Sequence, residues 1–178
     1  QPSPEALEQS GHLVARLHSL IEDQGGWISF ATYMAEALYA PALGYYSGGA
    51  RKFGAGGDFI TAPELTPLFG QAIATQIQQI MELSAPHIIE AGAGTGLLAA
   101  DLLLELELRG ALPESYAILE VSGELRERQR QCIVRDAPRW LERVVWLERF
   151  PEHFDGLVLG NELLDAMPVH LLSWQESG

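Results

Sequence analysis

The feature that most constrains this chain is a glycine-rich turn at residues 90–96, with the sequence Glu-Ala-Gly-Ala-Gly-Thr-Gly. The apolar segment 87–90 before it is typical of a short buried strand, and the leucine-dense segment 97–109 after it is typical of a helix. Glycines at such a junction let the backbone approach a ligand closely, and the start of a helix presents free N–H groups to it. The turn therefore predicts a nucleotide-binding α/β domain.

The residues of the turn distinguish between classes of nucleotide. A phosphate-binding P-loop would end in Gly-Lys-Ser or Gly-Lys-Thr, whereas two leucines follow Gly96. A dinucleotide site has the spacing Gly-x-Gly-x-x-Gly, and the third glycine here comes one position early. Glu90, at the end of the strand, is a poor neighbour for a pyrophosphate but a natural partner for the sulfonium and amino group of S-adenosylmethionine. The predicted cofactor-binding residues of the turn are Glu90, Gly92, Gly94, Thr95 and Gly96.

The pattern Glu-x-Gly-x-Gly-x-Gly is that of class I methyltransferases, and a second acidic residue supports this interpretation. Glu120 ends the next predicted strand, residues 116–120. An acid at that place accepts hydrogen bonds from ribose hydroxyls in related folds. Glu120 lies further from Gly92 than the ~20 positions usual in dinucleotide folds, and the long leucine helix and the loop at Pro113 account for the difference. Glu120 is therefore predicted to bind the ribose of the cofactor.

Polar side chains also follow the predicted strand 156–160. Ligands of an open α/β sheet bind outside the carboxyl ends of its strands, so Asn161 and Glu162 are expected where a methyl acceptor would meet the sulfonium. A carboxylate there can orient a guanidinium and help to remove its proton as the methyl group transfers. Asp165 would share that face if the stretch is helical. These three are the candidate catalytic residues, beside the alternative that Glu162 is a capping acid and Asp165 a solvated loop acid.

The remaining pattern predicts the architecture. Short apolar segments alternate with helical ones, which is typical of a parallel α/β sheet covered on both faces. Beyond the strands already described, we expect strands at 144–147 and 170–174. A helix is expected at 4–24. Three further helices are expected to follow N-cap residues: one after Ser29 that ends near Tyr39, one after Thr66 that ends near Leu83, and one after Ser122 that ends near Arg135. We therefore predict a helical, glycine-rich N-terminal extension over residues 1–85 and an α/β core over residues 86–178 that lacks its C-terminal part.

Charge and composition narrow the partners. The net charge of −13 repels phosphate backbones, which disfavours general nucleic-acid binding and would suit a cationic substrate, although solubility alone also favours an acidic balance. No apolar run approaches the ~18 residues that span a bilayer, and the five histidines match no zinc spacing. The single Cys132 and the lack of a targeting segment favour a cytoplasmic location.

Several strings together resemble the MidA-like family of methyltransferases. The string Gly-Asp-Phe-x-Thr-x-Pro-Glu at residues 57–64 is more specific to that family than the glycine turn. The other matching segments are residues 44–47, 53–56, 69–70, 90–96, Glu120 and 161–168. The resemblance covers most of residues 41–174, and proteins of that family are usually much longer than this chain.

The resemblance implies a Rossmann-like class I fold with S-adenosylmethionine at residues 90–96 and Glu120. It implies that residues 54–64 close over the cofactor, with Gly56, Gly57 and Asp58 near its methionine end. Composition alone would make that segment a flexible loop. Mitochondrial members assist the assembly of respiratory complex I and methylate a protein arginine, so the implied acceptor is an arginine-containing protein, and the implied compartment in a eukaryote is the mitochondrial matrix.

Two functions remain open at this point. The first is methyl transfer, which candidate residues at both the cofactor and the acceptor positions favour. The second is an assembly factor or scaffold that binds S-adenosylmethionine without turnover, and the presence of Glu162 and Asp165 argues against it. The register of the glycines disfavours a dinucleotide-dependent oxidoreductase. No oligomeric state follows from the sequence.

Overall fold

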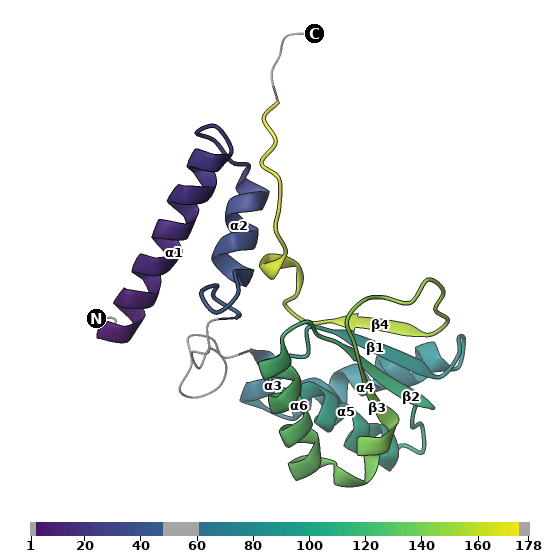
Figure 1. Ribbon diagram of the computed structural model, residues 1–178. Helices are drawn as coiled ribbons and strands as arrows, with labels where there is room; N and C mark the ends of the chain where they lie inside the picture. The colour runs from purple at the N-terminus through teal and green to yellow at the C-terminus, as the bar shows by residue number, and fades with distance from the viewer. Residues whose placement is uncertain (1–2, 48–60, 175–178) are drawn as a thin grey trace. The chain divides into compact units, whose positions relative to one another are not determined.

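The computed structural model describes residues 3–47 and 61–174. They form two compact units (Figure 1): the described residues of Gln1–Ala50 and Leu164–Gly178, and those of Arg51–Leu163. The sequence places its division between residues 85 and 86 instead. The difference arises because helix α4 (Leu68–Met81) belongs to the core of the sheet unit, where its Ala74 and Ile77 are fully buried.

The first unit is built on two helices whose ends follow local chemistry. Helix α1 (Pro4–Asp23) begins after Ser3 and ends before Gly25, which has a φ of 80°. Helix α2 (Phe30–Tyr39) begins after Ser29, whose hydroxyl accepts a hydrogen bond from the backbone N–H of Thr32 at 3.1 Å, as an N-cap does. Both predicted helices are thus confirmed.

The C-terminal segment of the first unit differs from the prediction. After the short 3₁₀ helix η2 (Leu164–Ala166), the described residues 167–174 have no regular structure and are exposed. The hydroxyl of Tyr39 donates to the carbonyl of Ala166 at 2.7 Å. The strand predicted at 170–174 is wrong, because a strand requires backbone partners and this apolar segment has none among the described strands.

The second unit contains a parallel sheet of four strands in the order β3-β2-β1-β4. The strands are β1 (His87–Ala91), β2 (Ser115–Leu119), β3 (Val144–Leu147) and β4 (Leu157–Gly160). Ile89 is in register with Ala117 of β2 on one side and with Val158 of β4 on the other. The chain therefore moves outward from β1 to β3 and then returns to the opposite side of β1. The carboxyl ends of β1 and β4 meet at this reversal of strand order, which is where open α/β sheets bind ligands.

Helices cover one face of this sheet. Helix α5 (Leu97–Leu108) packs between α4 and α6 (Gly123–Asp136), and its buried leucines form the centre of the hydrophobic core. This position explains why α5 has buried apolar residues around most of its circumference, beside its acidic Asp101, Glu105 and Glu107. A short helix, α3 (Ala62–Leu65), contacts both α4 and α5, and the 3₁₀ helix η1 (Pro138–Arg143) follows α6.

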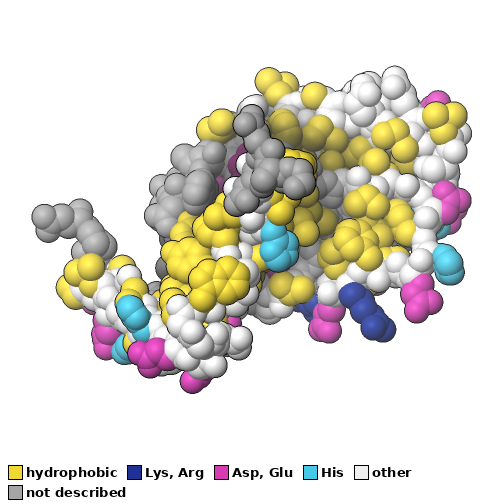
Figure 2. All heavy atoms as spheres, turned by 90° about the horizontal axis from the view of Figure 1, so that it is seen from above, with side chains coloured by type: hydrophobic (Ala, Val, Ile, Leu, Met, Phe, Trp, Pro, Cys, Tyr) yellow, Lys and Arg dark blue, Asp and Glu magenta, His cyan; other side chains and the backbone are white. Residues whose placement is uncertain are grey.

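In the part of the chain that the structure describes, no helix layer covers the second face of the sheet, although Ile89 at its centre is buried. Residues 148–156, between β3 and β4, contain no helix that could supply a second layer. Val145 and Val158, which alternate with core-facing neighbours in β3 and β4, are 47% and 52% exposed. Hydrophobic side chains are accordingly prominent on the face drawn in Figure 2. The fold class is nevertheless the predicted one, a parallel α/β sheet with N-terminal helices.

Candidate functional site

The glycine turn connects β1 to α5 through three residues in the left-handed region. Gly92, Gly94 and Gly96 have φ values of 68°, 54° and 85°. Gly92 N–H donates to the carbonyl of Leu119 at 3.1 Å, which joins the turn to the end of β2. Gly96 occupies the N-cap position of α5 without a side-chain cap, and the first turn of α5 contains no acidic residue. The first N–H groups of the helix are therefore left for another acceptor.

Gly94 and Gly96 differ in their surroundings. A Cβ atom on Gly96 would lie 2.8 Å from the Cα of Gln129 in α6, which is closer than real Cβ atoms approach a backbone. A Cβ atom on Gly94 would meet nothing within 4 Å. The turn is thus packed tightly on α6 at Gly96 and open at Gly94, as a ligand-facing position requires.

This contrast leads to a stability prediction. We expect Gly96→Ala to lower the free energy of unfolding by about 3 kcal/mol, since the left-handed φ costs ~1–2 kcal/mol and the forced contact a further ~1–3 kcal/mol. Gly94→Ala should show only the first of these costs. Chemical denaturation of both variants measures the difference, and equal losses would contradict the tight packing of the turn on α6.

Glu90 lies in the core below the turn. Glu90 is 2% exposed, and its Oε2 accepts a hydrogen bond from the hydroxyl of Tyr116 in β2 at 2.7 Å. Burial raises the pKa of Glu90 to about 7, and the hydrogen bond from Tyr116 acts in the opposite direction. The pKa of Tyr116 is also raised, mainly by burial and to a lesser extent by the nearby Glu90. One oxygen of the predicted sulfonium partner is therefore already engaged by the protein.

The raised pKa predicts a pH dependence of stability. Because folding raises the pKa of Glu90 from 4.5 to about 7, the folded state holds more protons than the unfolded state between these values. The resulting stabilisation, about 3 kcal/mol, is complete below pH 4.5 and is lost as the pH rises through 7. Glu90→Gln keeps an oxygen acceptor for Tyr116 and removes this titration. Urea unfolding of both proteins at pH 5 and pH 8 should show a smaller loss in the variant, and parallel losses would contradict the prediction.

Glu120 directly follows β2 and is held by two donors. Its Oε1 accepts from the backbone N–H of Ser122 at 2.9 Å, and its Oε2 accepts from Nε2 of Gln129 at 3.2 Å. The residue is 8% exposed. Burial raises the pKa of Glu120, while hydrogen bonds from Ser122 and then Gln129 lower it. The carboxylate is thus oriented by α6 and its N-terminus.

Gln129 is the site residue that sequence reasoning missed. It is fully buried, and its amide also donates to the carbonyl of Gly94 at 3.1 Å. The surrounding sequence of α6, rich in arginine and glutamate, is typical of a solvated helix. A single glutamine in it gives no signal, because its burial depends on contacts with β2, β3 and the glycine turn.

The remaining predicted cofactor residues are Thr95, Gly56, Gly57 and Asp58, and of these the structure describes Thr95. The Thr95 hydroxyl donates to Oε1 of Glu64 at 3.5 Å, so the end of the family-specific string, in α3, contacts the glycine turn. Gly56, Gly57 and Asp58 lie outside the described residues. Their predicted position near the methionine end stays a prediction.

The candidate catalytic residues follow β4. Asn161 and Glu162 leave the sheet next to the end of β1, because Gly160 is in register with Ala91. Glu162 has a φ of 50°, which is uncommon for a residue with a side chain and costs ~1–2 kcal/mol. A strained residue beside a binding crevice is a reason to suspect a functional role. Asp165 lies in η2, which belongs to the other compact unit, so its predicted place on the same face as Glu162 stays a prediction.

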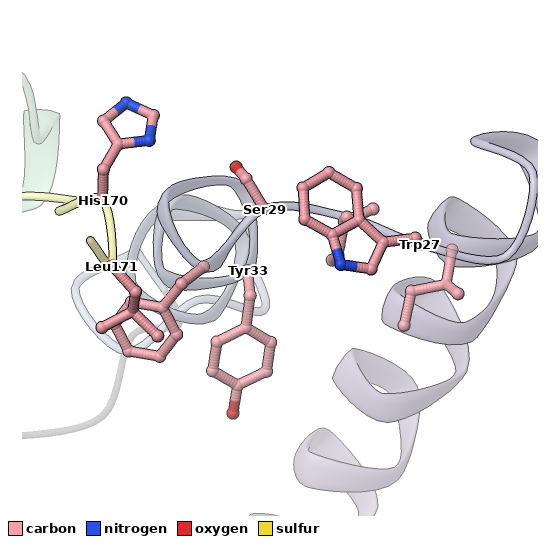
Figure 3. A pocket seen from close by; sticks show the side chains of 8 residues that line it. Trp27, Ser29, Tyr33, His170 and Leu171 are labelled. Atoms are coloured by element: carbon pink, nitrogen blue, oxygen red, sulfur yellow. The ribbon is translucent and has the colours of Figure 1, made fainter. Parts of the chain in front are cut away.

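A hollow of ≈ 500 Å³ lies in the unit that contains α1 and α2. Figure 3 shows Trp27, Ser29 and Tyr33 around it, with His170 and Leu171 from the C-terminal segment. None of the predicted site residues lines it. The predicted cofactor residues that are described all belong to the other unit.

Residues 3–47 and 61–174 contain neither a candidate metal site nor a candidate membrane span. No group of three or more histidine, cysteine, aspartate or glutamate side chains there could hold a metal ion. No helix there has both the length and the apolar character needed to cross a membrane.

Comparison with known proteins gives consistent matches. Residues 68–178 match the sequence model of a family described as "Putative S-adenosyl-L-methionine-dependent methyltransferase". The chain is 34% identical to the mitochondrial protein arginine methyltransferase NDUFAF7 of Danio rerio, over 86% of this chain and 42% of that protein. It is 33% identical to the Drosophila melanogaster homolog, over 99% of this chain and 47% of that protein. The chain thus spans less than half the length of these curated relatives.

A solved structure is also similar. A crystal structure of a Burkholderia thailandensis protein bound to S-adenosyl-homocysteine is 51% identical to this chain, with a TM-score of 0.89. The match covers 94% of this chain and 45% of that one. A second, native structure of a protein from the same organism is 49% identical with a TM-score of 0.85, and it covers 96% of this chain and 43% of that one.

Proposed function

The chain belongs to the MidA-like family of S-adenosylmethionine-dependent methyltransferases, and from that premise we propose that the protein transfers a methyl group from S-adenosylmethionine to a protein arginine. The cofactor predicted from the sequence is that of the family. The observation that carries the proposal is the strand order. Because β1 and β4 are parallel neighbours, the glycine turn and Asn161 leave the sheet at the same edge.

The proposed site divides its residues between two tasks. The turn, including Thr95, and the uncapped start of α5 hold the cofactor, and Glu120 accepts hydrogen bonds from the ribose hydroxyls. Glu90 contributes negative charge below the turn when it is ionised, which burial restricts to pH values near or above 7. The family resemblance adds Gly56, Gly57 and Asp58 near the methionine end. When bound, S-adenosylmethionine supplies an electrophilic methyl group.

Asn161 and Glu162 are proposed to hold the acceptor. The Glu162 carboxylate would orient a guanidinium through charge-assisted hydrogen bonds and take up its proton as the methyl group transfers. The exposure of Glu162 and its place at the edge of the sheet support this role. Asp165 is proposed as a second acidic residue that binds the acceptor. This role rests only on its position three residues after Glu162 in the sequence.

Arginine is proposed as the acceptor on two grounds. The curated relatives at about one-third identity are named protein arginine methyltransferases. The net charge of −13 would attract a cationic protein segment and repel nucleic acid. We propose the cytoplasm as the compartment, because the relative with 51% identity is bacterial, and the mitochondrial matrix if the source is a eukaryote, as the names of the animal relatives indicate.

Calorimetric titration with S-adenosylmethionine and with NAD tests the cofactor part of the proposal. Binding should be seen with S-adenosylmethionine only, and a preference for NAD would overturn the proposal. Incubation with a labelled methyl donor and host lysate then tests turnover, followed by analysis of labelled proteins for methylarginine. Label on another residue type would refute the arginine acceptor. If the protein binds S-adenosylmethionine but shows no methyl transfer that is lost on substitution of Glu162, the alternative is favoured, an assembly factor or scaffold without turnover.

A further inference from the structure

Gln129 connects the glycine turn to Glu120. Its side chain is fully buried, and its Nε2 lies 3.1 Å from the carbonyl oxygen of Gly94 and 3.2 Å from Oε2 of Glu120. Its backbone packs against Gly96, where a Cβ atom would come within 2.8 Å of the Gln129 Cα. One amide group therefore bridges the glycine turn and the predicted ribose acid.

Trp146 fixes which way this amide points. The indole Nε1 of Trp146, in β3, donates to Oε1 of Gln129 at 2.9 Å. An indole N–H can only donate, so its partner must be the amide oxygen, and the amide NH₂ must face Gly94 and Glu120. A flip of the amide would place two donors against each other and the amide oxygen against two acceptors. The orientation is therefore determined by the buried hydrogen bonds.

The hydrogen bonds to Glu120 leave it able to accept more. An ionised carboxylate has about four acceptor sites, two on each oxygen. The N–H of Ser122 engages Oε1 and the amide of Gln129 engages Oε2. The backbone N–H of Val121 also acts on the carboxylate. The acceptor sites that these protein donors leave can take a further donor, such as a ribose hydroxyl.

We propose that Gln129 is a positioning residue, which sets the Glu120 carboxylate relative to the glycine turn so that its remaining acceptor sites meet the ribose hydroxyls of S-adenosylmethionine. The inference rests on the proposed function. It assigns to Gln129 no contact with the cofactor, and its effect on binding passes through Glu120. Arg126 supports the same geometry by donating from Nε to the backbone carbonyl of Glu120 at 2.7 Å.

The test is a double-mutant cycle on cofactor affinity, measured by calorimetry with S-adenosylmethionine. Gln129→Met, which keeps length but removes the amide, should weaken binding about 10- to 100-fold, the effect of one hydrogen bond to a charged group. In a Glu120→Ala background the same substitution should have little further effect. The KM for S-adenosylmethionine should rise with kcat nearly unchanged, since the ribose is bound equally before and during transfer. Independent, additive losses, or a fall in kcat alone, would overturn the inference.

Two further variants guard against misfolding. Gln131, in the same helix but exposed and bonded to Glu127, is the matched control, and Gln131→Met should leave affinity unchanged. Trp146→Phe removes the donor that orients the amide, together with part of a ring that packs against the core, and should weaken binding several-fold. If Gln129→Met and Trp146→Phe both bind S-adenosylmethionine with wild-type affinity, the inference on Gln129 is refuted. The proposed function is unaffected by that result, because the wild type still binds the cofactor. Absence of binding in the wild type would instead refute the proposed function.

Discussion

Glu162→Gln should lower the rate of methyl transfer about 100-fold or more while leaving the affinity for S-adenosylmethionine unchanged. A positioned acid–base group contributes about 10²- to 10⁴-fold to a rate, and glutamine retains the shape but not the charge or basicity. Glu162 follows β4 at the carboxyl edge of the sheet and holds a φ of 50°. Its backbone is therefore strained where the proposed acceptor binds. Initial rates with labelled donor, together with calorimetry, separate the two effects.

Glu162→Gly adds a second measurement. Glycine adopts a φ of 50° without strain, so this variant should be more stable than the wild type by about 1 kcal/mol and equally inactive. Glu152, an exposed acid ahead of β4, is the control, and Glu152→Gln should leave the rate unchanged. An active Glu162→Gln variant would restrict this residue to the structural role of ending β4.

Glu120→Ala should weaken binding of S-adenosylmethionine about 100-fold or more. Two hydrogen bonds from ribose hydroxyls to a carboxylate are lost, each worth ~1.5–3 kcal/mol. Gln129 still has the carbonyl of Gly94 as a partner, so the variant leaves no orphaned amide group. Calorimetry measures the affinity, and thermal unfolding checks that the fold is retained.

Glu120→Gln provides the graded control for this residue. It keeps one oxygen acceptor and the shape of the side chain, although its NH₂ group must face one of the two protein donors. The loss of affinity should therefore not exceed that of Glu120→Ala and is expected to be on the order of 10-fold. Affinity unchanged in Glu120→Ala would show that the ribose lies elsewhere. Such a result would remove the basis of the inference on Gln129 as well.

Local features of the sequence were sufficient for most of the fold. The hydroxyls of Ser29 and Ser122 cap α2 and α6 as predicted, and the glycine turn lies between strand and helix. These features depend on neighbouring residues, whose chemistry is visible in the sequence. Helix α4 shows the limit: it begins at Leu68, with Pro67 rather than Thr66 at the cap position. Its buried face also includes Gly70 and Ala74, because α5 approaches closely there.

Non-local features were not predictable in this way. The apolar segment 170–174 has the composition of a strand, but strand formation depends on a partner elsewhere in the chain. Glutamine is a residue type that usually lies on the surface, and Gln129 is buried only because α6 packs on the turn. The residues proposed to contact the cofactor directly could therefore be predicted from the sequence. A residue that orients one of them, such as Gln129, could not.

The strand order also bears on how the site is assembled during folding. Ile88 of β1 pairs with Tyr116 of β2 and with Leu157 of β4, which lies much further along the chain. The entropy of closing a loop increases with its length, so pairing of β1 with β2 should precede pairing with β4. The cofactor side of the proposed site, at the ends of β1 and β2, would then form first, because the segment between these two strands is the shorter one and closes more rapidly. The acceptor side would be completed only when the late strand docks, and it would be the first part to open in the native state.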